Sequence, residues 1–230
     1  MLDRLKVRAI TLDLDDTLWP IWPTIARAET ALQDWLRDRA PGASALLADV
    51  RIRHDLREQA LQMHPAISHQ LSAVRRELIR LALARAQEDT ALAEPAFEVF
   101  FAVRQDVQLF EDARPALEAL AARYPLVALS NGNADIARIG LSRYFKASLS
   151  AEQLGFGKPD ARIFLAGAQA AGVPPEAVLH IGDDAALDVL GALACGMQTV
   201  WVNREDHLWT HDAHPHETVT RLAELPALLD

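Results

Sequence analysis

The sequence has very little cysteine and no long apolar run, and each shortage excludes a class of protein. Cys195 is the only cysteine among 230 residues, so no internal disulfide can form and a disulfide-stabilised fold is excluded. No apolar stretch is long enough to span a membrane. The first apolar run stops at Asp13, which argues against a secretory signal peptide. We therefore expect a cytoplasmic protein without a membrane partner.

Basic residues are also scarce. Lysine and arginine together number 23 against 32 aspartates and glutamates, which gives a net charge of −9. Such a balance disfavours non-specific binding of nucleic acid or of anionic membranes. It leaves a phosphorylated small molecule possible, because a local pocket can be cationic on an acidic protein. We expect a small-molecule ligand, no nucleic acid, and a monomer or weak homodimer.

Hydrophobic residues, in contrast, make up 50% of the chain, enough for a sizeable core. Short apolar runs predict strands, and helical patterns separate most of them. Alternation of this kind predicts an α/β fold, a doubly wound, Rossmann-like parallel sheet with right-handed crossovers. The expected strands cover residues 7–12, 126–129, 147–150, 178–181 and 198–202.

The segment between the first two strands has only helical periodicity. We expect helices over about 24–40, 44–63, 68–87 and 93–109. This segment is too long for a crossover and predicts an inserted all-helical domain over 21–109. The core domain then comprises 1–20 and 110–230. Its expected helices cover 112–123, with Asp112 as N-cap, a segment from about 135, 160–171, a segment ending at Cys195, and 221–229.

Carboxylates stand directly after the first strand. In an open parallel sheet, ligands bind beyond the carboxyl ends of the strands, so Asp13 and Asp15 should lie at the mouth of a site. Both would point the same way if the extended backbone continues. Two carboxylates about 4 Å apart repel by about 4 kcal/mol at an effective dielectric of about 20. A cation between them, or protonation of one, would remove this repulsion.

Further polar residues follow the other strands. Ser130 and Asn131 follow the second strand, and Lys158 lies in the loop after the third. The fourth strand is followed by Asp183, Asp184 and, one helical turn later, Asp188. Each group has an ordinary explanation on its own: a turn for Ser130-Asn131, a solvated loop for Lys158 and a helix N-terminus for the aspartates. Together, however, all of them converge on one edge of the sheet.

These residues match the needs of phosphoryl transfer. Carboxylates from two strand ends form an all-oxygen cage that suits Mg²⁺, and a lysine offsets the charge of a phosphoryl group. A serine hydroxyl and main-chain N–H groups can hold the phosphoryl oxygens. One aspartate can form an aspartyl-phosphate, while its neighbour protonates the leaving oxygen and later deprotonates a water.

In this order the motifs resemble the haloacid dehalogenase-like (HAD) hydrolase superfamily. They are Asp13-Leu14-Asp15-Asp16-Thr17, Ser130-Asn131, Lys158-Pro159, and Gly182-Asp183-Asp184 through Asp188. The resemblance implies that Asp13 is the nucleophile and Asp15 the general acid and base. It implies substrate binding by Ser130, Asn131 and the catalytic Lys158. Mg²⁺ would be held by Asp13, the Asp15 carbonyl and Asp183, with Asp184 and Asp188 in support. The helical insert looks like the family's C1 cap, which selects the substrate.

Dehalogenases of this superfamily lack the second aspartate of the first motif, so Asp15 favours phosphate-ester hydrolysis. The core motifs are similar to those of bacterial flavin mononucleotide phosphatases, which also act on the phosphorylated ribitylaminouracil of riboflavin synthesis. We therefore predict a Mg²⁺-dependent phosphatase of a small metabolite. The alternatives are a phosphomutase, nucleotidase or sugar phosphatase, or a non-catalytic HAD-like binding protein. A dinucleotide-dependent oxidoreductase is excluded, since no Gly-x-Gly-x-x-Gly follows the first strand.

Two aromatic or histidine-rich stretches are left over. Trp19 and Trp22 follow the first motif and would stack on a flat substrate or pack at the hinge of the insert. Four histidines lie close together near the C-terminus, and because no cysteines are nearby, a solvated loop is favoured over a zinc site. The histidines are His207, His211, His214 and His216.

Overall fold

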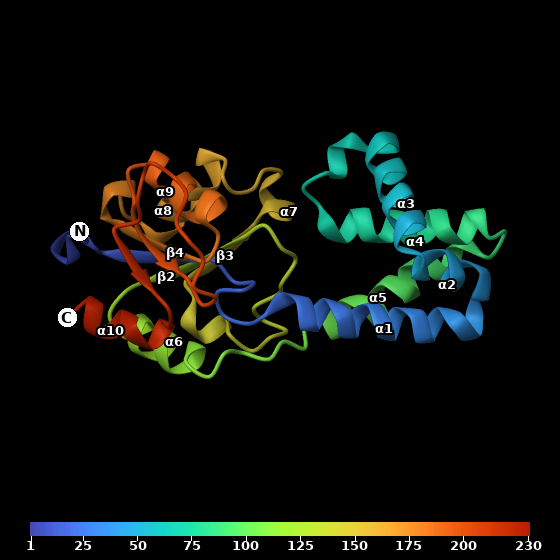
Figure 1. Cartoon of the computed structure of the whole chain (residues 1–230), viewed down its shortest axis with the longest axis horizontal. Helices are drawn as coiled ribbons and strands as arrows, with labels where there is room; N and C mark the ends of the chain where they lie inside the picture. Colours follow the sequence, from blue (N-terminus) through green and yellow to red (C-terminus); the bar gives the residue numbers. More distant parts are fainter. The chain divides into compact units, whose positions relative to one another are not determined.

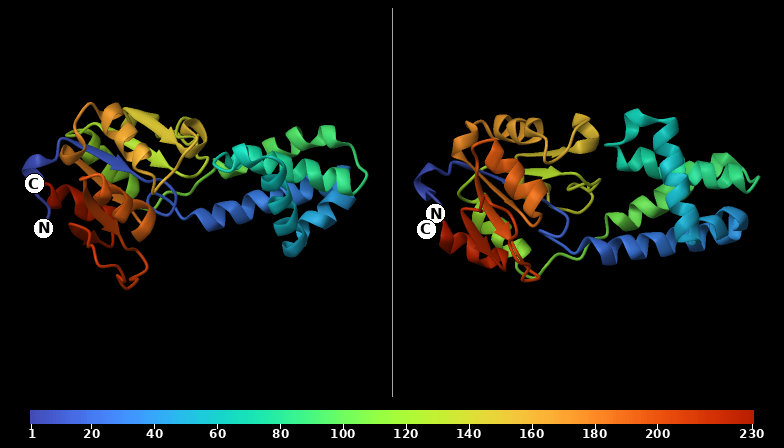
Figure 2. Two further views of the ribbon diagram at one scale, coloured as in Figure 1. Left: turned by 90° about the horizontal axis from the view of Figure 1, so that it is seen from above. Right: turned by 45° about the horizontal axis from the view of Figure 1, so that its top comes forward.

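The computed structural model describes all residues 1–230 and divides into two compact units (Figure 1). The α/β unit comprises Met1–Pro20 and Gln108–Asp230, and the helical unit comprises Ile21–Val107. Both chain ends belong to the α/β unit, where Figure 2 shows them close together. None of the helices combines the length and the apolar composition needed to cross a bilayer.

A six-stranded parallel sheet forms the centre of the α/β unit. Its order is β3-β2-β1-β4-β5-β6. The chain moves outward from β1 to β3, then returns to the other side of β1 for β4. This reversal places the crevice for a ligand between β1 and β4, at the carboxyl ends of the strands. The strands are β1 (Ala9–Leu12), β2 (Leu126–Ser130), β3 (Ala147–Ser150), β4 (Val178–Gly182), β5 (Gln198–Val202) and β6 (Glu217–Val219).

Helices cover both faces of this sheet, which confirms the predicted α/β class. In Figure 1, α8 and α9 lie on one face, while α6 and α10 lie on the other. The helices of this unit are α6 (Ala113–Ala121), α7 (Ala151–Leu154), α8 (Ala161–Ala171), α9 (Gly191–Ala194) and α10 (Leu225–Leu228). A π-helical segment, η6 (Ala185–Leu190), precedes α9. Short 3₁₀ turns are η1 (Arg4–Lys6), η2 (Pro65–Ile67), η3 (Thr90–Leu92), η4 (Ser142–Tyr144), η5 (Pro175–Ala177) and η7 (Leu222–Glu224).

Apolar spacing explains how α8 packs on the sheet. Ile163 and Phe164 are fully buried in the same core cluster as Val127 and Leu129 of β2. Gly167 lets the helix approach closely, since a Cβ there would lie 3.0 Å from the Leu129 methyl groups. Burial of each large apolar side chain contributes about 1.5–3 kcal/mol. This packing holds the carboxyl ends of β1 and β2 in place.

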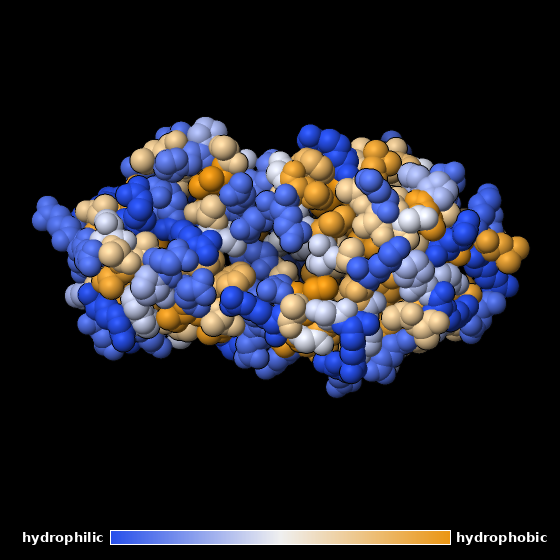
Figure 3. Space-filling view, turned by 180° about the vertical axis from the view of Figure 1, so that it is seen from behind, coloured by the Kyte–Doolittle hydropathy of each residue, from blue (hydrophilic) through white to orange (hydrophobic).

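The helical unit contains only helices. A core cluster lines their inner faces and includes Leu32, Leu47, Leu78 and Phe97. The helices are α1 (Ile21–Arg39), α2 (Pro41–Ala48), α3 (Val50–Met63), α4 (Leu71–Arg85) and α5 (Ala93–Arg104). In both units, the face drawn in Figure 3 has hydrophobic residues scattered among hydrophilic ones, as is usual for protein surfaces.

The predicted helix over 44–63 is wrong as a single element. It is interrupted at Asp49, whose carboxylate accepts hydrogen bonds from the N–H groups of Arg51 and Ile52, at 2.8 and 3.2 Å. This cap starts a new helix at Val50, whose side chain is 67% exposed. Pro41 begins the preceding helix instead of only ending the one before it, because proline is favoured in a first turn.

Three expectations in the α/β unit need correction. The segment from 135 forms turns instead of a helix. Strand β6 has three residues, too few for a periodic signal, and was not expected. Asp112 precedes α6 but makes no side-chain cap. Its carboxylate instead accepts hydrogen bonds from Leu222 N at 2.6 Å and from Arg204 Nη2 at 3.1 Å.

Candidate active site

Asp13 lies directly beyond β1 and is 7% exposed. Its N–H donates to the carbonyl of Ile181 on β4 at 2.9 Å, so the two strands stay paired up to this point. The chain then turns back at Asp16, whose φ of +58° lies in the left-handed region that aspartate tolerates better than most residues. The Asp16 N–H donates to the carbonyl of Trp19 at 2.8 Å and closes the turn.

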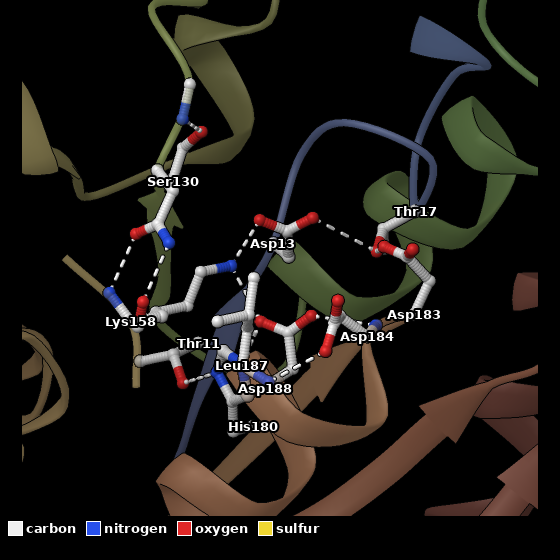
Figure 4. Close-up of polar contacts among 12 residues, drawn as sticks. Thr11, Asp13, Thr17, Ser130, Lys158, His180, Asp183, Asp184, Leu187 and Asp188 are labelled. Carbon is white, nitrogen blue, oxygen red and sulfur yellow. Dashed lines mark hydrogen bonds and ion pairs between the residues drawn. The ribbon is translucent and has the colours of Figure 1, made fainter. Parts of the chain in front are cut away.

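Lys158 lies at the centre of a buried ion-pair cluster (Figure 4). Its Nζ contacts the Asp13 carboxylate and lies 2.6 Å from Oδ1 of Asp188. Burial alone would lower the pKa of Lys158, but these two carboxylates raise it well above its ordinary value. Burial would likewise raise the pKa of Asp188, yet Lys158 and the hydrogen bond from His180 hold it well below its ordinary value. Lys158 is therefore cationic and Asp188 anionic at neutral pH.

Asn131 fixes the main chain of Lys158. The Asn131 side-chain oxygen accepts from Lys158 N at 2.7 Å, and its side-chain nitrogen donates to Lys158 O at 2.8 Å. Both polar atoms of the Asn131 amide therefore bind the main chain of Lys158, which belongs to the next motif. Substrate binding by Asn131 remains a prediction, whereas its contact with Lys158 is an observed feature of the fold.

The π-helical segment determines where Asp188 points. The Asp184 carboxylate accepts from the N–H groups of Ala186 and Leu187 at 2.8 and 2.7 Å, so it caps this segment. The Asp184 N–H donates to Oδ2 of Asp188 at 3.0 Å. Short π-helical turns are frequent at functional sites. Here the segment directs Asp188 back to Lys158, while Asp184 itself stays exposed.

Asp183 lies on the other side of Asp13 and is held by two neighbours. The Thr17 hydroxyl donates to its Oδ1 at 2.8 Å and also lies 3.4 Å from Oδ2 of Asp13. The Trp201 indole N–H donates to the Asp183 carbonyl at 2.7 Å. Burial, followed by the charge of Asp188, raises the pKa of Asp183 to about 7. Burial and the neighbouring carboxylates also raise the pKa of Asp13, against the opposing charge of Lys158.

Three carboxylates can reach a common point. One oxygen from each of Asp13, Asp183 and Asp188 lies within 4.8 Å of the others. When all three are ionised, their negative charges exceed the single positive charge of Lys158 by two, and hard oxygen donors are those that divalent Mg²⁺ prefers. The donor set therefore fits a divalent metal ion. The Asp15 carboxylate is outside this set and accepts from Trp19 Nε1 at 2.8 Å.

A cavity of about 170 Å³ lies over this cluster. Ser130, the last residue of β2, lines it; its Oγ accepts from Gly132 N at 2.9 Å, which leaves the hydroxyl hydrogen for another acceptor. All the predicted site residues therefore come together. The lining residues are Asp13, Asp15, Ser130, Asn131, Gly132, Lys158, Asp183, Asp184, Leu187 and Asp188.

Four residues around the site have no role predicted from the sequence: Thr11, Thr17, His180 and Trp201. Thr17 stands four residues after Asp13 inside the first motif, and this spacing was an available signal. His180 also has a recognisable signal in the sequence, since a titratable residue in a buried strand needs a hydrogen-bond partner. Nothing in the local sequence around Trp201 indicates that its indole reaches the Asp183 carbonyl.

The two tryptophans after the first motif and the four C-terminal histidines lie outside the ion-pair cluster. Trp19 is fully buried, so it cannot stack on a substrate, whereas Trp22 is 75% exposed. Of the four C-terminal histidines, His211 and His214 contact the Trp209 ring, with centroids 5.3 and 6.1 Å away. None of the four belongs to the group of potential metal ligands.

Comparison with known proteins identifies the class. A family model described as haloacid dehalogenase-like hydrolase matches residues 7–196. The chain belongs to this family, as its motifs predicted. Among curated proteins, it is 32% identical to the 5-amino-6-(5-phospho-D-ribitylamino)uracil phosphatase YigB of Escherichia coli, over 97% of both chains. It is 31% identical to a phosphoserine phosphatase of Thermus thermophilus, over 95% of this chain and 98% of the relative.

These relatives confirm the predicted enzyme class, a phosphoric monoester hydrolase. The fold is also similar to a solved structure from Pseudomonas syringae, described as a 2-haloacid dehalogenase, with a TM-score of 0.92 and 39% sequence identity. The match covers 97% of this chain and 98% of that one.

Proposed function

We propose that this protein is a Mg²⁺-dependent phosphatase that hydrolyses a small phosphorylated metabolite through an aspartyl-phosphate on Asp13. The observation that carries the proposal is the position of Lys158 between the Asp13 and Asp188 carboxylates, at the bottom of a cavity that Ser130 also lines. A non-catalytic binding protein would not need this lysine directly against the nucleophile.

The residues divide the reaction into two balanced steps. An Asp13 oxygen attacks phosphorus, the P–O bond to the alcohol breaks, and Asp15 gives its proton to the leaving oxygen. Asp15 then takes a proton from water, whose oxygen attacks phosphorus and releases phosphate and free Asp13. The Ser130 hydroxyl and the Lys158 ammonium hold phosphoryl oxygens, and positioning with charge neutralisation supplies most of the rate.

The metal would be held by the three-carboxylate set of Asp13, Asp183 and Asp188, together with the Asp15 carbonyl that the family resemblance implies. When bound, Mg²⁺ supplies positive charge that offsets the phosphoryl oxygens and the nucleophile. Thr17 and Trp201 keep Asp183 in place for this role through its carboxylate and its carbonyl.

For the substrate, we propose a ribityl phosphate, with flavin mononucleotide as the accessible test compound. The similarity to the Escherichia coli enzyme along 97% of both chains supports this choice. The helical unit is proposed to act as the C1 cap that selects the substrate. Nucleotides, sugar phosphates and phosphoserine are the competing esters, and transfer to a second sugar position would indicate a phosphomutase.

Dehalogenation is the second candidate, favoured by the similar structure from Pseudomonas syringae. The two reactions differ in the leaving group: an alkoxide needs a proton, whereas a halide does not. Asp15, which lines the cavity two residues after Asp13, can supply that proton. This residue favours phosphate esters.

The deciding experiment is a substrate panel assayed with Mg²⁺ and with a chelator. It contains flavin mononucleotide, phosphoserine, nucleotides, sugar phosphates and 2-chloropropionate, with release of phosphate and of chloride measured separately. We expect Mg²⁺-dependent phosphate release, fastest with the ribityl ester. Chloride release without phosphate release would refute the phosphatase, and a faster nucleotide or phosphoserine would refute only the substrate. Asp15→Asn is the matched variant, expected to lose phosphate release.

A further inference from the structure

A row of three buried polar side chains lies beneath the cavity. The Thr11 hydroxyl is 2.8 Å from Nδ1 of His180, and Nε2 of His180 is 3.1 Å from Oδ1 of Asp188. All three residues are at most 1% exposed. Figure 4 shows the row leading from β1 through His180 to Asp188. Neither Thr11 nor His180 lines the cavity, so neither can contact a substrate.

The chemistry of these groups determines the direction of the hydrogen bonds. The ionised carboxylate of Asp188 can only accept, so Nε2 of His180 carries a hydrogen and donates it. In a neutral imidazole, Nδ1 then has no hydrogen and accepts from the Thr11 hydroxyl. Asp188 thus selects the tautomer with a hydrogen on Nε2, and the hydrogen bond between the Thr11 hydroxyl and Nδ1 holds the ring in the orientation that directs this donor at Asp188.

The surrounding fold holds the imidazole ring in this orientation. Thr11 and His180 are paired residues on the adjacent strands β1 and β4. Phe164 of α8 meets the ring edge-on, with centroids 5.1 Å apart and planes at 89°. Gly191 makes room for Phe164, because a Cβ at 191 would lie 2.7 Å from the Phe164 ring. A rotated imidazole would lose both hydrogen bonds inside the core.

His180 and Lys158 bind the same oxygen of Asp188. Oδ1 is 3.1 Å from the histidine and 2.6 Å from the lysine, while Oδ2 accepts from Asp184 N at 3.0 Å. A carboxylate held by these donors cannot rotate, so the Lys158 ammonium binds it in one fixed position. From that position the ammonium contacts Asp13. We infer that His180, oriented by Thr11, is a positioning residue that fixes Asp188 and, through it, Lys158 for the reaction at Asp13.

This inference rests on the proposed phosphatase activity, whichever ester is the substrate. If His180 merely filled the core, any side chain of similar volume that allows the protein to fold would support full turnover. Glutamine and asparagine separate the two cases. The glutamine amide ends near the position of Nε2 and can donate to Asp188, whereas the asparagine amide ends near Nδ1 and cannot reach it.

The kinetic test compares His180→Asn with His180→Gln, and Thr11→Val with Thr11→Ser, in the full chain with saturating Mg²⁺. We expect His180→Asn and Thr11→Val to lower kcat by about 10–100-fold with little change in KM. We expect glutamine and serine to restore most of that loss. The exposed His54→Asn is the control. Equal kcat for the asparagine and glutamine variants, at matched melting temperatures, would overturn the inference while leaving the phosphatase standing.

Two readouts do not depend on turnover. In the wild-type protein, ¹⁵N NMR of the His180 ring should show a protonated Nε2 and a bare Nδ1; a hydrogen on Nδ1 alone would refute the proposed orientation. Calorimetric Mg²⁺ binding should weaken about 10–100-fold in Thr11→Val and recover in Thr11→Ser. These two measurements still test the inference if no ester is hydrolysed or if His180→Asn fails to fold. A hydrogen on Nδ1 alone, together with unchanged Mg²⁺ affinity in Thr11→Val, would then overturn the role of His180.

Discussion

The position of Asp188 leaves no room for a side chain at Gly182. A Cβ there would overlap the Asp188 carboxylate, although the backbone at 182 does not have the positive φ that requires glycine. The glycine of the fourth motif is therefore explained by its neighbour, because the β4 backbone has to pass directly beside the carboxylate that binds Lys158.

We expect Gly182→Ala to lower both activity and stability. The added methyl group would push Asp188 away from Lys158, reducing kcat by about ten-fold or more and the free energy of unfolding by about 1–3 kcal/mol. Steady-state kinetics and urea unfolding would measure the two effects. Gly140→Ala is the control, since its positive φ costs about 1–2 kcal/mol while open space surrounds it and no site residue is near. Unchanged kcat in Gly182→Ala would contradict the overlap.

Asn131→Ala should act through Lys158. Removing the amide breaks both hydrogen bonds to the Lys158 main chain, so the ammonium loses its fixed approach to Asp13. We expect kcat to fall by about ten-fold or more while KM changes little. A large rise in KM at constant kcat would instead support the sequence-based prediction that Asn131 binds substrate.

Asp13→Asn should abolish turnover with little loss of fold. An amide is a poor nucleophile, and Lys158 keeps Asp188 as its anionic partner. We expect a decrease in kcat of more than about 10³-fold, with an unchanged circular dichroism spectrum. Asp34→Asn, on the exposed face of α1, serves as the reference. Full activity in Asp13→Asn would eliminate the covalent mechanism.

Mg²⁺ should raise the melting temperature. Binding at Asp13, Asp183 and Asp188 relieves the repulsion among three carboxylates, and 100-fold excess over Kd stabilises the folded state by about 2.7 kcal/mol. For a chain of this size, each kcal/mol corresponds to about 2–4 °C. Differential scanning fluorimetry with Mg²⁺ and with chelator measures the shift. Asp183→Asn should abolish most of it, and a shift that persists in that variant would place the ion elsewhere.

Asp112 should make stability depend on pH. Burial alone would raise its pKa, but Arg204 and the main-chain N–H of Leu222 hold the pKa below the ordinary value of 3.8. The ionised form therefore stabilises the folded state above about pH 3.8, and this contribution is lost as the pH falls through the lower folded-state pKa. We expect Asp112→Asn to cost about 1.5–3 kcal/mol at pH 7, and the difference from wild type to shrink at acidic pH. Urea titrations at pH 7, 4 and 3 would detect this trend; a difference that grows on acidification would reverse the assigned sign.

Much of the architecture could be predicted because its signals are local. Alternation of apolar runs with helical periodicity is written in consecutive residues, and β5 was expected with the bounds that it has. The break at Asp49 was missed because a cap residue inside a helical pattern competes with continuation of the helix, and only packing decides between them. The turns at 136–140 reflect the same competition between local propensity and tertiary contacts.

The chemical groups at the strand ends follow from the residue order alone, since a buried strand followed by Asp13, Ser130 or Asp183 delivers that group to one edge of a parallel sheet. How these groups pair is a property of the folded chain. Asn131 binds the Lys158 main chain, and His180 meets Asp188 across eight residues and one π-helical turn. The reason is physical: strand order brings side chains to the same edge, whereas hydrogen-bond partners depend on the ångström-scale packing of loops and turns that sequence spacing does not specify.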